Sequence, residues 1–201
     1  WRLNLGQAIA AGVGSDGQQV AIVTRQNELV VMQNGKVQWQ QSLPAQSFTA
    51  PLVAGARVFV LTADRSVIAF DGATGRQLWT QQRAGEPLVL KQAGVMLAVK
   101  NTLVVGLSGR LAGLDPNTGV IRWESAIATP RGTNDVERLV DLVAPFDRVG
   151  DVVCVRAFQT AVGCVNADRG QGVWTRPSAG EMGVSGNDTL LVAPLSNGVV
   201  Q

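Results

Sequence analysis

Short runs of hydrophobic residues, separated by glycine, asparagine and aspartate, recur along the whole chain. Four of these runs are LVVM at 29–32, VIAF at 67–70, LAGL at 111–114 and VGCV at 162–165. Similar runs such as VAIVT and VFVLT precede them, with turn residues in between. Runs of this length, rich in valine and bounded by turn residues, are typical of β-strands. The pattern predicts an all-β protein.

The tryptophans mark an internal repeat. They are Trp1, Trp39, Trp79, Trp123 and Trp174, and subtraction gives separations of 38, 40, 44 and 51 residues. A four-stranded propeller blade takes roughly 40–50 residues. The last four tryptophans each follow a glycine by four positions, and these glycines are Gly35, Gly75, Gly119 and Gly170. We therefore predict a β-propeller of four-stranded antiparallel blades, with repeats at 1–39, 40–79, 80–123 and 124–174 and a partial repeat at 175–201.

Each repeat contains two predicted turns. One precedes the glycine in three copies, at Asp71–Gly75, Asp115–Gly119 and Asn166–Gly170, where the first residue bonds its own backbone and the glycine supplies a positive φ. The other lies around Gln26-Asn27, Asp64-Arg65, Ser108-Gly109, Gln159-Thr160 and Ser196-Asn197-Gly198. The lengths of strands and turns favour a propeller over a solenoid.

A single four-stranded sheet cannot bury both of its faces, so neighbouring sheets must stack. We expect each tryptophan to act as a large rigid wedge between adjacent blades. Three aligned small residues, Ala69, Gly113 and Cys164, are expected where the sheets converge near the propeller axis.

Composition removes several classes of function. The chain has 201 residues, 46% of them hydrophobic, with 17 Lys and Arg against 15 Asp and Glu, so a nucleic-acid-binding charge pattern is missing. It contains no histidine and no tyrosine, which excludes histidine-based triads and most zinc sites. No apolar run is long enough for a membrane span, and the first residues lack a signal-peptide layout. The DGATG turn lacks the lysine and the helix of a phosphate loop.

The repeat at 124–174 carries an additional segment at 131–148, and long loops on a rigid scaffold often bind partners. Asn134 and Glu137 have capping-box spacing, and the spacing of Val136, Leu139, Val140 and Val143 predicts one or two amphipathic helical turns. The alternative is a surface insertion folded against its own blade.

Cys154 and Cys164 are equidistant from the turn near residue 159, so they are expected to lie opposite each other in a hairpin. They form either a disulfide or a pair of buried thiols, because bridges between directly opposed strand residues are geometrically demanding.

The sequence AFDGATGRQLW at 69–79 resembles the repeats of quinoprotein-type propellers, a family that includes PQQ-dependent dehydrogenases and non-catalytic relatives. Two further segments are similar to the lipoproteins of the β-barrel assembly machinery of the bacterial outer membrane. One is RGTNDVERLVDLVAPFDRVGDVV at 131–153, with its R-L-x-D core at Arg138–Asp141, and the other is Leu88–Lys91. This resemblance extends over nearly all of the chain.

The resemblance implies a non-catalytic scaffold without cofactor or metal, in which Leu88, Leu90, Lys91, Arg138 and Asp141 bind the POTRA domains of the barrel-assembly subunit. Lys91 stands where the family more often has arginine, and its ammonium lacks the planar guanidinium fork. Val143 replaces an expected second acidic residue. For Leu88, Leu90 and Lys91 the structural alternative is a core strand with the lysine directed outward.

The resemblance also implies a place at the periplasmic face of the outer membrane, with a lipid anchor on the full-length protein. It implies eight blades, of which this chain would supply four to five. We therefore expect a fragment whose missing blades belong to the rest of the protein or are replaced by self-association.

Two other functions remain as alternatives. A fragment of a PQQ-dependent quinoprotein dehydrogenase would bind PQQ and Ca²⁺ at the axis, yet the adjacent cysteine pair of those enzymes is absent from the sequence. A WD-type cytosolic scaffold would need a Gly-His signature, which a chain without histidine lacks.

Overall fold

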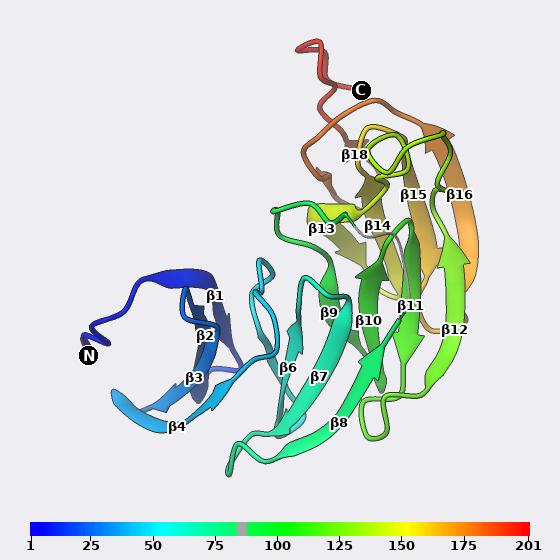
Figure 1. The fold of residues 1–201 in the computed structure, drawn as a ribbon. Coiled ribbons are helices and arrows are strands. Elements are labelled where there is room, and N and C mark those ends of the chain that lie inside the picture. The colour runs from blue at the N-terminus through cyan, green and yellow to red at the C-terminus, as the bar shows by residue number, and fades with distance from the viewer. Residues whose placement is uncertain (84–87) are drawn as a thin grey trace. The chain divides into compact units, whose positions relative to one another are not determined.

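The computed structural model describes residues 1–83 and 88–201, and its regular secondary structure within these ranges consists of β-strands. These strands form four antiparallel sheets of four strands and one short sheet of two (Figure 1). None of the described segments is a helix with the length and apolarity needed to cross a membrane. The predicted all-β character is therefore confirmed.

The bounds of the strands are as follows. The first sheet comprises β1 (Ile9–Ser15), β2 (Gln19–Thr24), β3 (Glu28–Gln33) and β4 (Lys36–Ser42), and the second comprises β5 (Leu52–Ala54), β6 (Arg57–Leu61), β7 (Ser66–Asp71) and β8 (Gln77–Gln82). The third sheet comprises β9 (Met96–Val99), β10 (Thr102–Leu107), β11 (Arg110–Leu114) and β12 (Ile121–Ala126). The fourth comprises β13 (Leu142–Val149), β14 (Val152–Ala157), β15 (Ala161–Asn166) and β16 (Gln171–Pro177), and the short sheet comprises β17 (Ser185–Gly186) and β18 (Leu191–Val192).

The chain divides into two compact units. One contains the first and second sheets together with the turn at 117–119, and the other contains the third and fourth sheets and the C-terminal segment. Within every four-stranded sheet, each strand pairs with the next one along the chain, as short hairpin connections require.

The predicted turns are confirmed by backbone conformation and hydrogen bonds. Asn27, Arg65, Ser108 and Gln159 have φ values of 62°, 63°, 57° and 51°. These residues have a left-handed backbone conformation, which most residues other than glycine avoid. Such a conformation is typical of tight turns, which here join the second and third strands of each sheet. In the other type of turn the Asp71 carboxylate accepts hydrogen bonds from the hydroxyl and the backbone N–H of Thr74, which lowers the pKa of Asp71.

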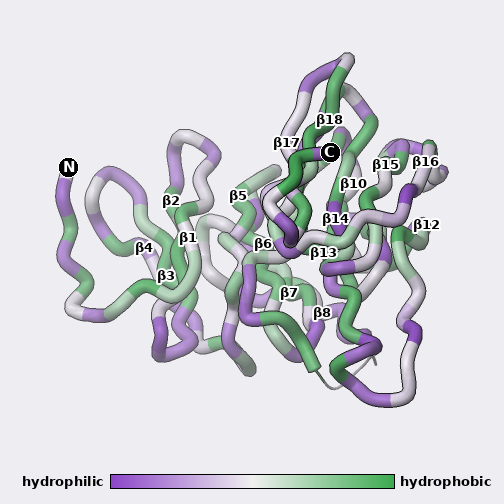
Figure 2. The backbone as a smooth tube through the Cα atoms, turned by 90° about the horizontal axis from the view of Figure 1, so that it is seen from above, coloured by the Kyte–Doolittle hydropathy of each residue, from purple (hydrophilic) through white to green (hydrophobic). Residues whose placement is uncertain are grey.

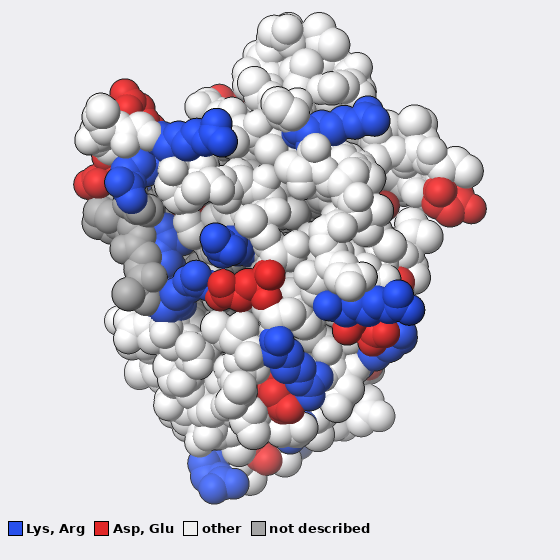
Figure 3. Space-filling model, turned by 90° about the vertical axis from the view of Figure 1, so that its right-hand side faces the viewer, with Lys and Arg blue, Asp and Glu red and all other residues white. Residues whose placement is uncertain are grey.

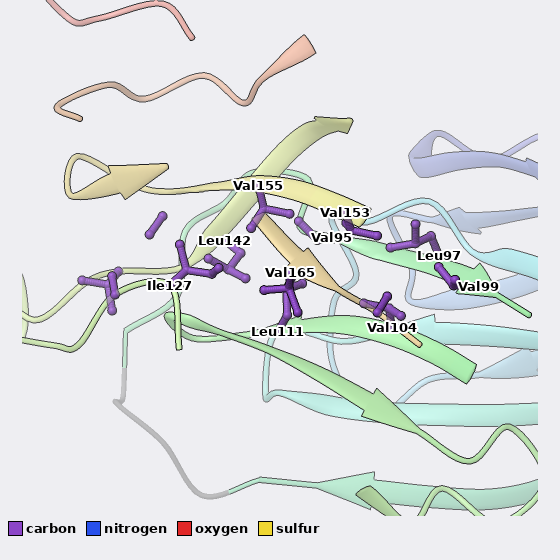
Figure 4. Close-up of a cluster of buried hydrophobic side chains, with 14 residues drawn as sticks. Val95, Leu97, Val99, Val104, Leu111, Ile127, Leu142, Val153, Val155 and Val165 are labelled. Carbon is purple, nitrogen blue, oxygen red and sulfur yellow. The ribbon is translucent and has the colours of Figure 1, made fainter. Parts of the chain in front are cut away.

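Alternation along the strands builds the core of each unit. In the first unit, Ala21 and Val23 of β2 face Val58 and Val60 of β6, and all four side chains are buried. In the second unit, side chains of the third and fourth sheets meet in one cluster that includes Val104 and Val155 (Figure 4). Hydrophobic strands alternate with hydrophilic connections along the chain (Figure 2), as a two-residue period with polar turns predicts.

The glycine that precedes each tryptophan is the packing surface for the tryptophan of the previous repeat. A Cβ atom added to Gly75 would lie 2.6 Å from the Trp39 ring, and one added to Gly119 would lie 2.6 Å from the Trp79 ring. Trp39 also donates its indole N–H to the carbonyl of Gly72 at 2.8 Å. The same contact joins Trp123 to Gly170 within the second unit. We call these three pairs, Trp39–Gly75, Trp79–Gly119 and Trp123–Gly170, the Gly–Trp contacts.

The tryptophans at the two ends of the series differ from the expected wedges. Trp1 is 73% exposed and packs more loosely, because a Cβ added to Gly35 would lie 3.2 Å from it. Trp174 is 38% exposed, and the ring lies near the Arg176 guanidinium, 5.8 Å from its carbon to the ring centroid. The inner members of the series, Trp39, Trp79 and Trp123, are half-buried and pack on the glycines of the following repeat.

A β-bulge stands directly before the tryptophan in each fourth strand. The register shifts between Val31 and Met32, between Ala69 and Phe70, between Gly113 and Leu114, and between Cys164 and Val165. An additional residue in one strand bends it and redirects the next side chain. The bulge therefore helps to set the direction of each indole, a feature that sequence reasoning did not identify.

The small residues in the third strand share one cross-strand position. Ala69, Gly113 and Cys164 are the direct partners of Trp79, Trp123 and Trp174, and Val31 has the same position opposite Trp39. A Cβ added to Gly113 would overlap the Trp123 ring, so contact with the indole requires a glycine there. That these residues are small because the sheets converge near the axis stays a prediction.

The C-terminal segment covers the second face of the fourth sheet. Val162 packs there with Val184 and Ala193. Arg156 is fully buried beside them and donates hydrogen bonds to the Ser178 carbonyl at 3.1 Å and the Pro194 carbonyl at 3.0 Å. Burial lowers the pKa of the Arg156 guanidinium, since desolvation disfavours the charged form.

Candidate partner-binding surface

Residues 88–91 lie outside the strands of the third sheet and precede β9. Leu88 is 40% exposed, Leu90 is half-buried and Lys91 is exposed. The alternative of a core strand is therefore wrong for this segment, although the outward position of Lys91 agrees with it. The segment presents one apolar and one cationic side chain to solvent.

The segment at 131–141 contains one turn, at 135–138, closed by the hydrogen bond from the Arg138 N–H to the Asn134 carbonyl, where one or two amphipathic turns were expected. Val136 is 72% exposed, Val140 is buried in the core, and Val143 belongs to β13. Val140 follows the turn at 135–138 and Val143 lies in β13, so these valines do not share one helical face. Helical periodicity over so few residues does not distinguish these cases.

The predicted cap at the start of this segment is present in modified form. Asn134 Oδ1 accepts the backbone N–H of Glu137 at 2.9 Å, as a capping box requires. Glu137 Oε2 accepts the N–H of Thr133 at 2.8 Å, whereas a capping box would use the N–H of Asn134. The Thr133 hydrogen bond lowers the pKa of Glu137, because it stabilises the carboxylate form.

The two sequence segments meet at Asp141. Its Oδ2 accepts the backbone N–H of Leu90 at 2.9 Å, across 51 positions of sequence. Its backbone carbonyl accepts the N–H of Phe158 at 3.0 Å. Arg138 lies in the same turn, half-buried, and its backbone N–H donates to the carbonyl of Asn134 at 3.2 Å. All five predicted binding residues thus belong to one unit, and the structure brings Leu90 directly against Asp141. We call residues 88–91 and 138–141 the candidate surface.

Neighbouring residues that sequence reasoning missed extend from the same end of the fourth sheet. Gln159 donates its backbone N–H to the Gly180 carbonyl at 2.8 Å and its side-chain N–H to Glu181 Oε1 at 2.9 Å. The turn predicted at Gln159-Thr160 could have indicated that these residues lie near Asp141. A turn between the second and third strands lies at the end of the sheet where the first strand begins, which is the position of Asp141.

Several charges elsewhere in the second unit form ion pairs. Lys100 Nζ lies 2.6 Å from the Asp151 carboxylate and 3.3 Å from that of Asp168, and Arg122 lies 2.6 Å from Asp115. On the face drawn in Figure 3, several basic and acidic side chains lie next to each other and uncharged residues cover most of the surface. That face has the character of an ordinary protein surface and not of a phosphate-binding one.

Cys154 and Cys164 are direct cross-strand partners on β14 and β15, as the turn position predicted, and they are joined by a disulfide in the structure. They line a cavity of about 330 Å³ together with Trp174, Asp147 and Leu190. Within the described residues, no three His, Cys, Asp or Glu side chains are grouped closely enough to hold a metal ion.

The repeated four-stranded sheets, joined in sequence by Gly–Trp contacts, define a β-propeller repeat protein. A protein-family model described as "Outer membrane protein assembly factor BamB" matches residues 1–201. The chain belongs to this BamB family.

Individual relatives agree with this assignment. The chain is 34% identical over 195 residues to the outer membrane protein assembly factor BamB of Burkholderia pseudomallei, covering 96% of this chain and 51% of that protein. It is 30% identical over 203 residues to BamB of Bordetella pertussis, covering 100% of this chain and 53% of that protein. The chain thus spans about half the length of these curated relatives.

Solved structures confirm the propeller fold. The crystal structure of BamB from Moraxella catarrhalis superposes with a TM-score of 0.91 at 20% identity, covering 100% of this chain and 62% of that chain. A europium-containing methanol dehydrogenase superposes with a TM-score of 0.67 at 15% identity, covering 89% of this chain and 43% of that chain. At these identities both likenesses show the fold alone.

Proposed function

We propose that this chain is part of a non-catalytic scaffold in outer-membrane β-barrel protein assembly, which binds the POTRA domains of the barrel-assembly subunit through the candidate surface. The protein would act at the periplasmic face of the outer membrane, with a lipid anchor on the full-length form. The relatives from Burkholderia pseudomallei and Bordetella pertussis are outer membrane protein assembly factors, which supports this process. One observation carries the choice of surface: Asp141 joins the two predicted segments by its hydrogen bond to Leu90.

The geometry of the surface suits a protein partner. Leu88 offers a partly exposed apolar side chain, and Lys91 offers a cation beside it. Binding energy at protein interfaces is concentrated in a few anchor residues, and we propose Leu88 and Lys91 as the anchors here. Residues 88–91 precede β9 of the third sheet and residues 138–141 precede β13 of the fourth.

The experiment is a binding titration with the purified POTRA segment. We expect Leu88→Asp and Lys91→Glu each to weaken binding by about tenfold or more, because a hot-spot truncation costs at least ~2 kcal/mol. Arg169→Glu is the matched control, since Arg169 is exposed in the turn between β15 and β16, at the other end of the fourth sheet. Equal affinity for all four proteins would refute the proposed surface.

The dehydrogenase alternative has only the fold in its favour. The two cysteines are ten positions apart, so they cannot form the adjacent cysteine pair expected of a quinoprotein dehydrogenase. Protein incubated with PQQ and Ca²⁺ and assayed for dye-linked alcohol oxidation would decide the matter. Measurable turnover would favour the enzyme over the scaffold.

A further inference from the structure

Asp141 has a firmly held backbone. Its carbonyl accepts the N–H of Phe158 at 3.0 Å, and the next residue, Leu142, donates its N–H to the Ser108 carbonyl at 3.2 Å. Leu142 is the first residue of β13 and is buried in the core. The Asp141 carboxylate therefore extends from a rigid base, which is what a side chain needs to fix another segment in place.

Residues 88–91 belong to none of the described strands. The Asp141 carboxylate, directly before β13, accepts the N–H of Leu90 in this segment. Beyond the segment, the Ala93 carbonyl accepts the N–H of Ala144 in β13 at 2.8 Å. The bond to Leu90 lies in the middle of the segment, between Leu88 and Lys91, so it determines where both exposed side chains are presented.

We infer that Asp141 is a positioning residue for partner binding: its carboxylate fixes the backbone of Leu90, and through it the direction of Leu88 and Lys91. This inference rests on the proposed function. A carboxylate that accepts a backbone N–H is a hydrogen-bond acceptor first, and an asparagine carbonyl of the same length offers the same acceptor without the charge. We therefore assign the positioning role to the carboxylate oxygen that accepts the Leu90 N–H, an acceptor that asparagine retains.

The test compares Asp141→Asn with Asp141→Ala in the full 201-residue chain, titrated with the purified POTRA segment. We expect Asp141→Asn to bind within about threefold of the wild type and Asp141→Ala to bind at least tenfold more weakly. If Asp141 instead formed an ion pair with the partner, both variants would lose affinity equally and the salt dependence of binding would decrease. That result would overturn the inference.

A double-mutant cycle adds a second readout. If Asp141 acts through residues 88–91, the losses caused by Asp141→Ala and Leu88→Ala are not additive, because the alanine at 141 already misplaces Leu88. We expect the double variant to bind about as weakly as the weaker single variant. Strictly additive losses would contradict the proposed route.

Hydrogen exchange separates this inference from the proposed function, because it needs no partner. The Leu90 amide is expected to exchange at least tenfold faster in Asp141→Ala than in the wild type and to keep its protection in Asp141→Asn. The urea midpoint of unfolding shows that each variant is folded. Equal exchange at Leu90 in all three proteins would overturn the positioning role, whereas failure of the wild type to bind POTRA would overturn only the proposed function.

Discussion

The Gly–Trp contacts and the candidate surface both join residues that are far apart in sequence, but they do so by different means. In the first case an indole packs directly on a glycine, as Trp39 does on Gly75. In the second a half-buried carboxylate accepts one backbone N–H. Close packing tolerates no added atom, whereas a single hydrogen bond can be exchanged for another acceptor. Stability should therefore depend on the first kind of contact, and presentation of a surface on the second.

The strongest test of this comparison adds a methyl group at the glycine of a Gly–Trp contact. We expect Gly75→Ala to lower the free energy of unfolding by about 2–5 kcal/mol, combining roughly 1–2 for the left-handed backbone and about 1–3 for overpacking against Trp39. Urea unfolding measures the change. Gly55→Ala is the matched control, because Gly55 also has a positive φ, 58°, and has no neighbouring atom within 4 Å of an added Cβ. Equal losses would show that backbone conformation alone requires the glycine.

The disulfide provides a covalent contact within one sheet for comparison. Cys154 and Cys164 close a loop with a sequence separation of 10, and chain entropy predicts about 2–3 kcal/mol of stabilisation for such a loop. Reductant should lower the thermal midpoint of the wild type and leave the Cys154→Ala/Cys164→Ala variant unchanged. Mass spectrometry of alkylated, unreduced protein checks the bridge itself. Two alkylated cysteines there would contradict it.

Arg156 makes hydrogen bonds from a buried position, and we expect their loss to lower the free energy of unfolding, as disruption of a Gly–Trp contact does. Arg156→Met is expected to cost about 2 kcal/mol in urea unfolding. The buried carbonyl of Ser178 and the half-buried carbonyl of Pro194 each lose a donor, an effect of about 1–3 kcal/mol for a buried group, which removal of a buried charge partly offsets. Arg169→Met, at an exposed turn position, serves as the control and should change little. If Arg156→Met left the free energy of unfolding unchanged, buried polar contacts would contribute no more to stability than exposed ones.

The smallest effect concerns the cap beside the candidate surface. The pKa of Glu137 is lower in the folded protein than its ordinary value of 4.5, so the stabilisation is present above the unfolded pKa and is lost as the pH falls through the folded pKa. Amide exchange at Thr133, corrected for intrinsic pH dependence, should therefore lose protection in acid. In Glu137→Gln the protection should be independent of pH over the same range, and an equal acid response in both proteins would exclude Glu137 as the titrating group.

Much of the fold could be predicted because it depends on local patterns that repeat. VIAF at 67–70 lies within β7, and Asn27 and Arg65 adopt the predicted tight turns. The pairing of Ala69, Gly113 and Cys164 with the tryptophans of the fourth strands was not predicted, because it depends on a bulge before each tryptophan. A bulge changes cross-strand register and leaves no distinct mark in a hydrophobic pattern.

The residues of the candidate surface were predicted from the family resemblance. The structure then showed that two of them are joined by a hydrogen bond. Leu90 and Asp141 are 51 positions apart, and no periodicity predicts a hydrogen bond between them. Val136 and Val140 have helical spacing, yet one is exposed and the other is buried, because the start of β13 takes the chain into the core. Irregular segments take their conformation from the elements on which they lie.

The amino-acid sequence alone determined the strands, the tight turns and the repeating distance between tryptophans, since these follow from side-chain alternation and the backbone freedom of glycine. Only the tertiary structure decided that each glycine carries the indole of the preceding repeat, that Arg156 is buried beneath the C-terminal segment, and that Asp141 holds Leu90. These contacts depend on how separate sheets and loops meet in space, and the free energy of such meetings comes from packing and hydrogen bonds between residues that sequence order does not relate.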